Sequence, residues 1–409
     1  MKAIALFDPI NSGEGLKTAA KQLGFQVVGV FTRPIELFEQ QFHLTRKQMF
    51  HDCDHVVVEE TLADILRELK PFPIVAAIAG LDSGVELADE TAHALKLFGN
   101  TLEHSKARRD KGEMRKLLQA KGLSCPAFAT CTTEQKVTEF AKTHPWPLVI
   151  KTPRGAATSQ VFVCEKLPQL LDSFRDITHT KDFFGGKTTV AVVEEYIGGR
   201  EYIVDTFSDG KTVHVTDVWL YEKIELDGFQ NIYYNVFGLP VNDPECQHVV
   251  QHAKQIVRAF GLMRGPAHLE IKDDPKRGPT LVEINARLAG ARIPEFTGKY
   301  GNFDVVKATV EVFVHGTANV PNEITYTKHF AMACCPLLQG GKVKSIAGID
   351  QIEKLPSYEM HQLNIQPGDV LETTKTSTTI ALFVYLAHAN RAKLLEDLAA
   401  AHRLFQVSF

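Results

Sequence analysis

The first hundred residues alternate between short apolar runs and amphipathic segments, and this alternation constrains the fold more than any other feature. The apolar runs are typical of buried strands and occupy residues 2–8, 25–32, 55–59 and 73–80. The segments between and after them predict helices at Asn11–Leu23, Leu62–Leu69 and Gly84–Leu97. Strands that alternate with helices favour a parallel, doubly wound sheet with helices on both faces.

Length and charge limit the class of protein. A chain of 409 residues is long enough for two to three domains. Its net charge of −4 gives no general attraction to nucleic acid or to an anionic membrane, so we expect neither as a partner. The apolar start is cut short by Asp8 and no run of about 18 apolar residues occurs, so neither a signal peptide nor a membrane span is predicted.

The cysteines indicate a reducing environment. There are seven, an odd number, and none forms a Cys-x-x-Cys pair. We therefore expect unpaired thiols and a cytoplasmic location.

The remainder of the chain predicts mixed α/β units. Helices are expected at 103–123, Glu134–Lys142, Leu167–Phe174, Cys246–Gly261, Asp304–His315 and Arg391–His402. Strands are expected at 147–152, 161–165, 188–197, 267–272, 280–288 and 381–389, with a hairpin around Asp209 and Gly210. We place the domains at residues 1–105, 106–192, 193–318 and 319–409, the last being a small closing α+β domain.

Two neighbouring strands near residue 280 carry polar side chains at alternate positions. Residues i, i+2 and i+4 of a strand share a face, so Glu283, Asn285 and Arg287 are expected on one side. Glu270 lies on the preceding strand, across a polar turn of hairpin length. Facing carboxylates raise each other's pKa unless a cation lies between them, and Mg²⁺ takes such oxygen ligands. The pattern favours a metal site over the alternative, a solvated hairpin face.

A second pattern points to phosphate binding. Lys151 ends a strand and is followed by a loop of small residues that contains Gly155, Ala156, Thr158 and Ser159. Small side chains allow backbone N–H groups to approach phosphate oxygens, and the lysine adds a positive charge. A plain hairpin turn is the alternative.

The stretch VVEEYIGGRE offers a place for a flat heterocycle. Glu194, Glu195, Tyr196 and Ile197 end an apolar strand, where backbone groups lie beside apolar walls. Glu201 could accept hydrogen bonds from ribose hydroxyls. The alternative is a strand end with solvated acids.

Together these elements resemble the ATP-grasp superfamily over about residues 100–315. The resemblance rests on Lys111 in RDKGEMRKLLQAKGL, on VIKTPRGAATS, on VEEYIGGREY, and on HLEIK followed by VEINARLAG. It implies an ATP-grasp fold in which a two-subdomain ATP-binding unit lies between an N-terminal doubly wound domain and a small C-terminal α+β domain.

The resemblance also implies roles for individual residues. Lys111 and Lys151 would contact the phosphates of ATP, the backbone of Glu195 and Ile197 would meet adenine with Glu194 nearby, and Glu201 would hold the ribose. Glu270, Glu283 and Asn285 would hold one or two Mg²⁺ ions, with Mn²⁺ as an alternative ion. Arg287 would stabilise the transferring phosphoryl group.

Within the superfamily the chain is similar to bacterial L-amino acid ligases, which join two amino acids into a dipeptide. The resemblance implies amino acids as substrates, an acyl phosphate intermediate and a homodimer. Arg292, which follows a bend at Gly290, is expected to bind the substrate carboxylate or acyl phosphate, and His268 to position a substrate group. A surface arginine and a core histidine are the alternatives. Purine-pathway or carboxylase-type enzymes and a non-catalytic nucleotide-binding regulator are the competing functions.

Overall fold

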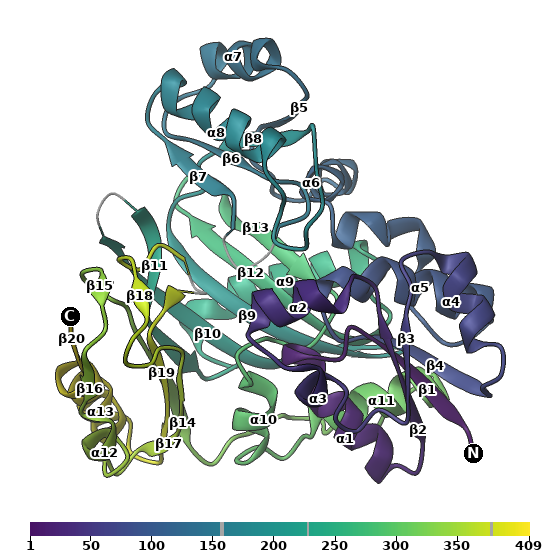
Figure 1. Ribbon diagram of the computed structural model, residues 1–409. Coiled ribbons are helices and arrows are strands. Elements are labelled where there is room, and N and C mark those ends of the chain that lie inside the picture. Colours follow the sequence, from purple (N-terminus) through teal and green to yellow (C-terminus); the bar gives the residue numbers. More distant parts are fainter. Residues whose placement is uncertain (156–158, 227–228, 377–378) are drawn as a thin grey trace.

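The computed structural model describes residues 1–155, 159–226, 229–376 and 379–409. Figure 1 shows a small lobe, which carries α7 and α8, standing above the rest of the molecule. Beneath it, the N-terminal sheet lies on the right of the view and the C-terminal elements on the left, and a large sheet runs between them.

The N-terminal sheet is parallel and has four strands in the order β3-β2-β1-β4. The strands are β1 (Ala3–Phe7), β2 (Gln26–Phe31), β3 (His55–Val58) and β4 (Ile74–Ala79). The helices that follow them are α1 (Glu14–Gln22), α2 (Ile35–Phe42), α3 (Arg46–Met49), α4 (Leu62–Leu69) and α5 (Val85–Ala94). Strand β1 is wholly buried because α1 covers the face of Ile4 and Leu6, and α4 and α5 cover the face of Ala5 and Phe7. The predicted doubly wound sheet is thus confirmed.

The small lobe is an antiparallel sheet in the order β5-β8-β6-β7 with two helices packed on it. Its elements are β5 (Phe128–Cys131), α7 (Glu134–Thr143), β6 (Leu148–Lys151), β7 (Val161–Cys164), α8 (Leu167–His179) and β8 (Ala191–Glu195). The predicted helix at 103–123 is wrong in its first part, where only short 3-10 turns occur. Helix α6 (Lys111–Ala120) begins after Asp110, whose carboxylate caps it by accepting the N–H groups of Gly112 and Glu113.

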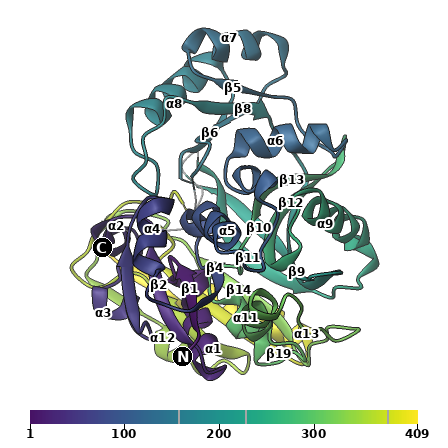
Figure 2. The same ribbon diagram turned by 90° about the vertical axis from the view of Figure 1, so that its right-hand side faces the viewer.

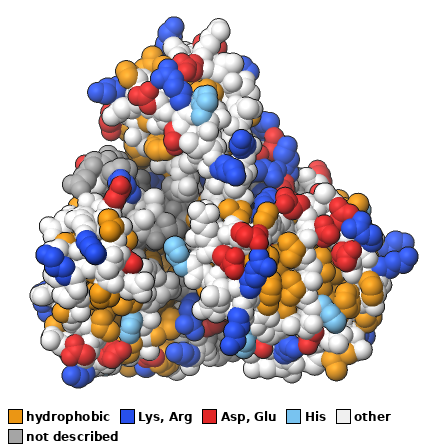
Figure 3. All heavy atoms as spheres, viewed as in Figure 1, with side chains coloured by type: hydrophobic (Ala, Val, Ile, Leu, Met, Phe, Trp, Pro, Cys, Tyr) orange, Lys and Arg blue, Asp and Glu red, His pale blue; other side chains and the backbone are white. Residues whose placement is uncertain are grey.

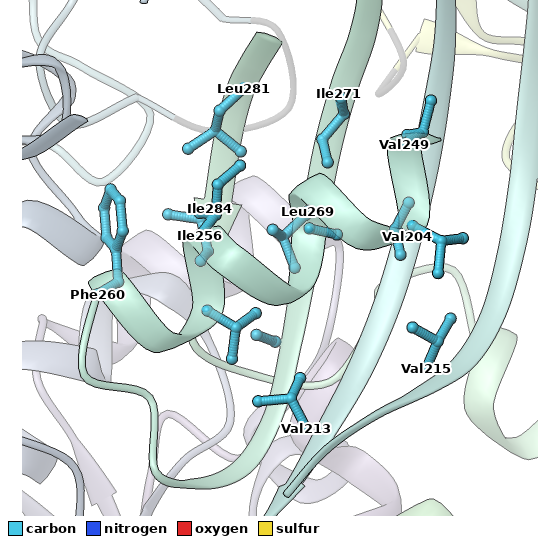
Figure 4. Packing of buried hydrophobic residues seen from close by; sticks show 14 of the residues in the cluster. Val204, Val213, Val215, Val249, Ile256, Phe260, Leu269, Ile271, Leu281 and Ile284 are labelled. Atoms are coloured by element: carbon cyan, nitrogen blue, oxygen red, sulfur yellow. The ribbon is translucent and has the colours of Figure 1, made fainter. Parts of the chain in front are cut away.

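The large sheet has eight strands in the order β13-β12-β9-β10-β11-β14-β19-β17. They are β9 (Arg200–Asp209), β10 (Val213–Leu226), β11 (Phe229–Leu239), β12 (Arg264–Asp274), β13 (Gly278–Asn285), β14 (His329–Cys335), β17 (Tyr358–Leu363) and β19 (Leu382–His388). Ile256 of helix α9 (Gln247–Ala259) and Phe260, directly after the helix, pack against Leu269 and Ile284 of the sheet (Figure 4). The two predicted hairpins, β9–β10 and β12–β13, are both present.

The C-terminal elements extend this sheet, since β14, β19 and β17 continue it beyond β11. Helix α13 packs on β14 and β19. The remaining elements are α10 (Ile293–Gly298), α11 (Val305–His315), β15 (Gly341–Lys342), β16 (Ser345–Ala347), α12 (Ile349–Ile352), β18 (Val370–Leu371), α13 (Arg391–Leu404) and β20 (Gln406–Ser408). Helix α11 packs against α1 and the N-terminal sheet (Figure 2). A helix from the predicted domain 193–318 therefore completes the hydrophobic core of the first hundred residues.

An aromatic turn at residues 181–187 joins the small lobe to the N-terminal helices. It lies between α8 and β8 and reaches down to α2 (Figure 2). Phe184 is buried among Phe31, Phe38 and other apolar side chains of the N-terminal part, and Phe183 packs edge-on against Phe42. Asp182 shapes the turn by accepting the N–H group of Phe184.

Two further predictions concern the cysteines and the membrane. All seven cysteines are free thiols, as expected. Among the described residues, no helix combines the length and the apolar character needed to cross a bilayer.

Candidate active site

A cleft of about 2840 Å³ lies between the small lobe, the large sheet and the N-terminal sheet. The space-filling view shows the surface hollowed beneath the small lobe (Figure 3). Of the predicted site residues that the structure describes, all but Glu195 line the cleft: Lys111, Lys151, Gly155, Ser159, Glu194, Tyr196, Ile197, Glu201, His268, Glu270, Glu283, Asn285, Arg287, Gly290 and Arg292. Ala156 and Thr158 lie outside the described residues. Asn11 and Ser12, in the turn after β1, line the cleft as well.

Two carboxylates oppose each other on the large sheet. Glu270 of β12 pairs with Glu283 of β13, and His268 pairs with Asn285. Burial and the carboxylates of Glu201 and Glu283 raise the pKa of Glu270. The expected pairing of the two acids across the hairpin is therefore observed.

These oxygens suit a magnesium ion. Two carboxylates and an amide are hard oxygen donors, and a divalent cation would relieve the repulsion that Glu270 experiences. In the part of the chain that the structure describes, no three His, Cys, Asp or Glu side chains converge on one point. The assignment of Glu270, Glu283 and Asn285 as metal ligands stays a prediction; an ion that shares its shell with phosphates and water needs few protein ligands.

Two lysines bring positive charge to the same region. Lys111, the first residue of α6, binds Glu283 at 2.9 Å and donates to the carbonyl oxygen of Gly155 at 3.3 Å. Lys151, at the end of β6, lies 2.5 Å from Glu194. Burial, together with Arg115 and Lys111, lowers the pKa of Lys151 to about 8 even though Glu194 opposes the shift.

Glu194 is the centre of a buried ion network. Arg115 binds it through Nε at 2.9 Å and Nη2 at 3.2 Å. Burial alone would raise the pKa of Glu194, but Arg115 and Lys151 outweigh it and lower the pKa to about 2. Arg115 also donates to the carbonyl oxygens of Leu281 and Val282, and so fixes β13 to the small lobe. The sequence reasoning did not find Arg115, although it lies one helical turn after Lys111.

The predicted nucleotide-binding strand end is only partly directed into the cleft. Tyr196 and Ile197 line it. Glu195 instead binds Arg277, and its backbone N–H donates to the carbonyl oxygen of Ala127 at 3.0 Å. The expected contacts of this segment with adenine stay a prediction.

Glu201 lies between two lysines that the sequence reasoning missed. Lys223 binds it at 2.6 Å and Lys272 at 3.6 Å. Lys223 also lies over the rings of Tyr221 and Tyr233, at 5.0 and 4.6 Å from their centroids. The expected role of Glu201 in holding ribose stays a prediction.

Four aromatic residues of β10 and β11 divide into two pairs. Tyr221 and Tyr233 line the cleft. Trp219 is buried in the core beside Phe330, and Tyr234 stacks on His402.

Arg287 lines the cleft with Glu283 and Asn285, but it lies outside the strand on which it was expected. Strand β13 ends at Asn285, so Arg287 lies in the turn that follows. Its Nη2 binds Asp82 at 2.8 Å, and its Nη1 donates to the carbonyl oxygen of Leu288 at 2.8 Å. Asp82 was missed in the sequence, although it follows β4 at the carboxyl end of a strand, where ligand crevices of parallel sheets form.

The expected substrate residues lie on separate elements, His268 on β12 and Arg292 at the start of α10. Nδ1 of His268 lies 2.7 Å from Oδ1 of Asp205. Burial and Arg287 lower the pKa of the His268 imidazole. Arg292 has a left-handed backbone with φ of 52° and an exposed side chain at the start of α10. The hydroxyl of Tyr385 holds this bend by donating to the carbonyl oxygen of Ala291 at 2.7 Å.

Comparison with known proteins agrees with this geometry. The ATP-grasp domain family matches residues 144–295, which include β6, β8 and the whole β12–β13 hairpin. The chain therefore carries an ATP-grasp domain, and the predicted superfamily is confirmed. Over its full length it is similar to a solved L-amino acid ligase from Bacillus licheniformis, with a TM-score of 0.82 and 17% identity, covering 100% of this chain and 99% of that one.

Two curated relatives extend the comparison. Dapdiamide A synthase from Enterobacter agglomerans is 29% identical over 298 residues, which span 72% of this chain and 69% of that protein. An L-arginine-specific L-amino acid ligase from Bacillus subtilis is 22% identical over 368 residues, with 87% of each chain covered. The predicted enzyme class, an ATP-dependent carbon–nitrogen ligase, is supported by these likenesses. N5-carboxyaminoimidazole ribonucleotide synthetase from Thermotoga maritima shares the fold at a TM-score of 0.68 and 14% identity, covering 100% of this chain and 99% of that one.

Proposed function

We propose that the protein uses ATP to activate the carboxylate of one amino acid and couples it to the amine of a second, forming a dipeptide. The observation that carries the proposal is the opposition of Glu270 and Glu283 in a cleft that also holds Lys111 and Lys151. The name of one curated relative, an L-arginine-specific L-amino acid ligase, supports amino acids as substrates.

Glu270, Glu283 and Asn285 would hold Mg²⁺, which neutralises phosphate charge and orients the terminal phosphates when bound. Lys111 and Lys151 contact the same phosphates in this proposal. Both lysines now bind glutamates, so each exchanges part of a protein ion pair for contacts with the nucleotide.

The reaction has two steps. An oxygen of the substrate carboxylate attacks the γ-phosphorus of ATP, the bond to the β-phosphate oxygen breaks, and ADP leaves. The amine nitrogen of the second substrate then attacks the acyl carbon, a C–N bond forms, the C–O bond to phosphate breaks, and the nitrogen loses a proton. Arg287 stabilises charge on the transferring group, while the small lobe excludes water from the acyl phosphate.

A matrix of amino acid pairs tests the proposal. With ATP and Mg²⁺, at least one pair should release ADP and phosphate in equal amounts and give a product whose mass is that of the dipeptide. Phosphate release that depends on bicarbonate or a phosphoribosylamine, and on no amino acid, would identify a carboxylase-type or purine-pathway enzyme instead. Tight ATP binding without turnover would indicate a regulator. A homodimer is proposed alongside, and light scattering measures the mass.

A further inference from the structure

Asp82 and Arg287 form an ion pair between two parts of the chain that are distant in sequence. Asp82 begins the turn after β4 of the N-terminal sheet, and Arg287 follows β13 of the large sheet. Their oxygen and nitrogen atoms, Oδ2 and Nη2, are 2.8 Å apart. Both residues line the cleft, so the pair joins the two sheets where they border it.

The pair is charged and largely removed from solvent. The side chains of Asp82 and Arg287 are 6% and 13% exposed. Burial by itself would raise the pKa of Asp82, but Arg287, Arg109 and Lys111 outweigh it, so the pKa is lowered and the carboxylate stays ionised at neutral pH. A charge-assisted bond in such a place holds a guanidinium more firmly than a solvated one does.

The two side chains also leave polar atoms unused. Asp82 Oδ1 and Arg287 Nε are buried and have no hydrogen-bond partner among the residues that the structure describes. Buried polar atoms without partners are rare, and a catalytic role is one of the explanations for them. Nη1 and Nη2 each donate one N–H group, to Leu288 and to Asp82, and each keeps a second N–H group, so the guanidinium retains donors for a reactant.

We propose that Asp82 is a positioning residue: its carboxylate fixes the guanidinium of Arg287 in the orientation in which its remaining N–H groups reach the group undergoing phosphoryl transfer. The inference rests on the proposed function, in which Arg287 stabilises that group. It also gives the N-terminal sheet a part in the reaction, because the guanidinium is correctly placed only when the turn after β4 is docked against the large sheet.

The test compares Asp82→Asn with Asp89→Asn. Asp89 is a suitable control because it forms a buried pair with Arg108 at 2.7 Å in the same part of the chain, but it does not line the cleft. Asp82→Asn should lower kcat by about 100-fold, since a displaced catalytic group has effects of that size. The KM for ATP should change by less than about twofold, because Asp82 does not itself bind the nucleotide. Asp89→Asn should lower thermal stability and leave kcat unchanged.

A second comparison separates a positioning role from a structural one. In a protein that already carries Arg287→Lys, adding Asp82→Asn should reduce kcat by less than about twofold relative to Arg287→Lys alone, because Asp82 acts only through Arg287. Asp82→Glu, which keeps the charge but moves it, should also lower kcat and serves if Asp82→Asn does not fold. A wild-type kcat in both Asp82 variants, or an equal loss in the Arg287→Lys background, would overturn the inference. If the unmodified enzyme responds to no amino acid, the proposed function fails, and the same ratios are measured with whichever carboxylic acid or bicarbonate stimulates phosphate release.

Discussion

Lys151 and Glu194 form a buried ion pair in which Nζ and Oε1 are 2.5 Å apart, on the neighbouring antiparallel strands β6 and β8. Arg115 binds the other side of the same carboxylate. The carboxylate of Glu194 is therefore shared by two cations. It does not fully neutralise the charge of Lys151, the lysine that is proposed to bind phosphate. This balance has consequences for both nucleotide binding and stability.

Nucleotide binding should weaken as the pH rises above about 8. The pKa of Lys151 is lowered to about 8, so in the free protein its ammonium loses a proton through that range. Bound phosphates favour the charged form, and binding then requires uptake of a proton, which lowers affinity by at most about tenfold per pH unit. Calorimetry with ADP and Mg²⁺ from pH 7 to 9.5 measures the slope. Lys151→Arg, which stays charged, should flatten it; an unchanged slope in that variant would assign the effect to another group.

Replacing Glu194 with Gln should destabilise the fold. Arg115 and Lys151 would remain buried without their counter-charge, a loss of about 3–5 kcal/mol in the free energy of unfolding. The pKa of Glu194 is lowered from 4.5 to about 2, so its contribution is complete above pH 4.5 and disappears as the pH falls towards 2. The difference in the free energy of unfolding between wild type and Glu194→Gln, measured in urea, should therefore decrease as the pH falls. Glu134→Gln, which breaks an exposed pair with Arg175, is the control and should change little.

The parts of the fold that could be predicted are those set by local pattern. The strand–helix alternation of the first hundred residues specified the N-terminal sheet, because strands buried on both faces must be apolar throughout. The polar turn between β12 and β13 fixed a hairpin, and the period of two along each strand then brought Glu270 opposite Glu283. The helix predicted at 103–123 shows the limit of local pattern. Its helical composition continues across Asp110, the residue that caps the true start of α6, so the sequence did not reveal where the helix begins.

The missed site residues depend on contacts between distant segments. Asp82 is recognisable only through Arg287, which lies on another sheet. Lys223 and Lys272 look like ordinary strand lysines until β9 pairs with both β10 and β12 and places Glu201 between them. No local pattern encodes such pairings, because strand order in a mixed sheet is decided by tertiary packing.

Removing the charge of Glu283 should abolish metal-dependent activity with the fold intact. Glu283→Gln leaves one carboxylate beside Asn285 and frees Lys111, so we expect turnover to fall by at least about 100-fold, consistent with several kcal/mol from metal-held charge. Calorimetry should show that Mg²⁺ no longer strengthens ADP binding. Asp273→Asn is a matched control on β12, since this acid binds His248 and does not line the cleft. Equal Mg²⁺ dependence in wild type and Glu283→Gln would remove Glu283 from the metal site.

Loosening the aromatic turn should uncouple ATP hydrolysis from amide formation. Phe184 is 5% exposed and packs between residues of the N-terminal part, so Phe184→Ala removes apolar contact that holds the small lobe closed. A lobe that opens more often admits water to the acyl phosphate, and the ratio of phosphate released to dipeptide formed should rise above one. Hydrogen exchange of residues 181–187 should quicken at the same time.

The control for this change is Phe140→Ala. Phe140 is 8% exposed and lies in the small lobe's own core, with no part in the contact with the N-terminal helices. Below the unfolding temperatures of both variants, Phe140→Ala should keep a ratio near one, because the lobe is weakened internally but remains docked. A ratio of one in Phe184→Ala as well would show that the aromatic turn contributes to stability alone, and that another contact keeps water from the intermediate.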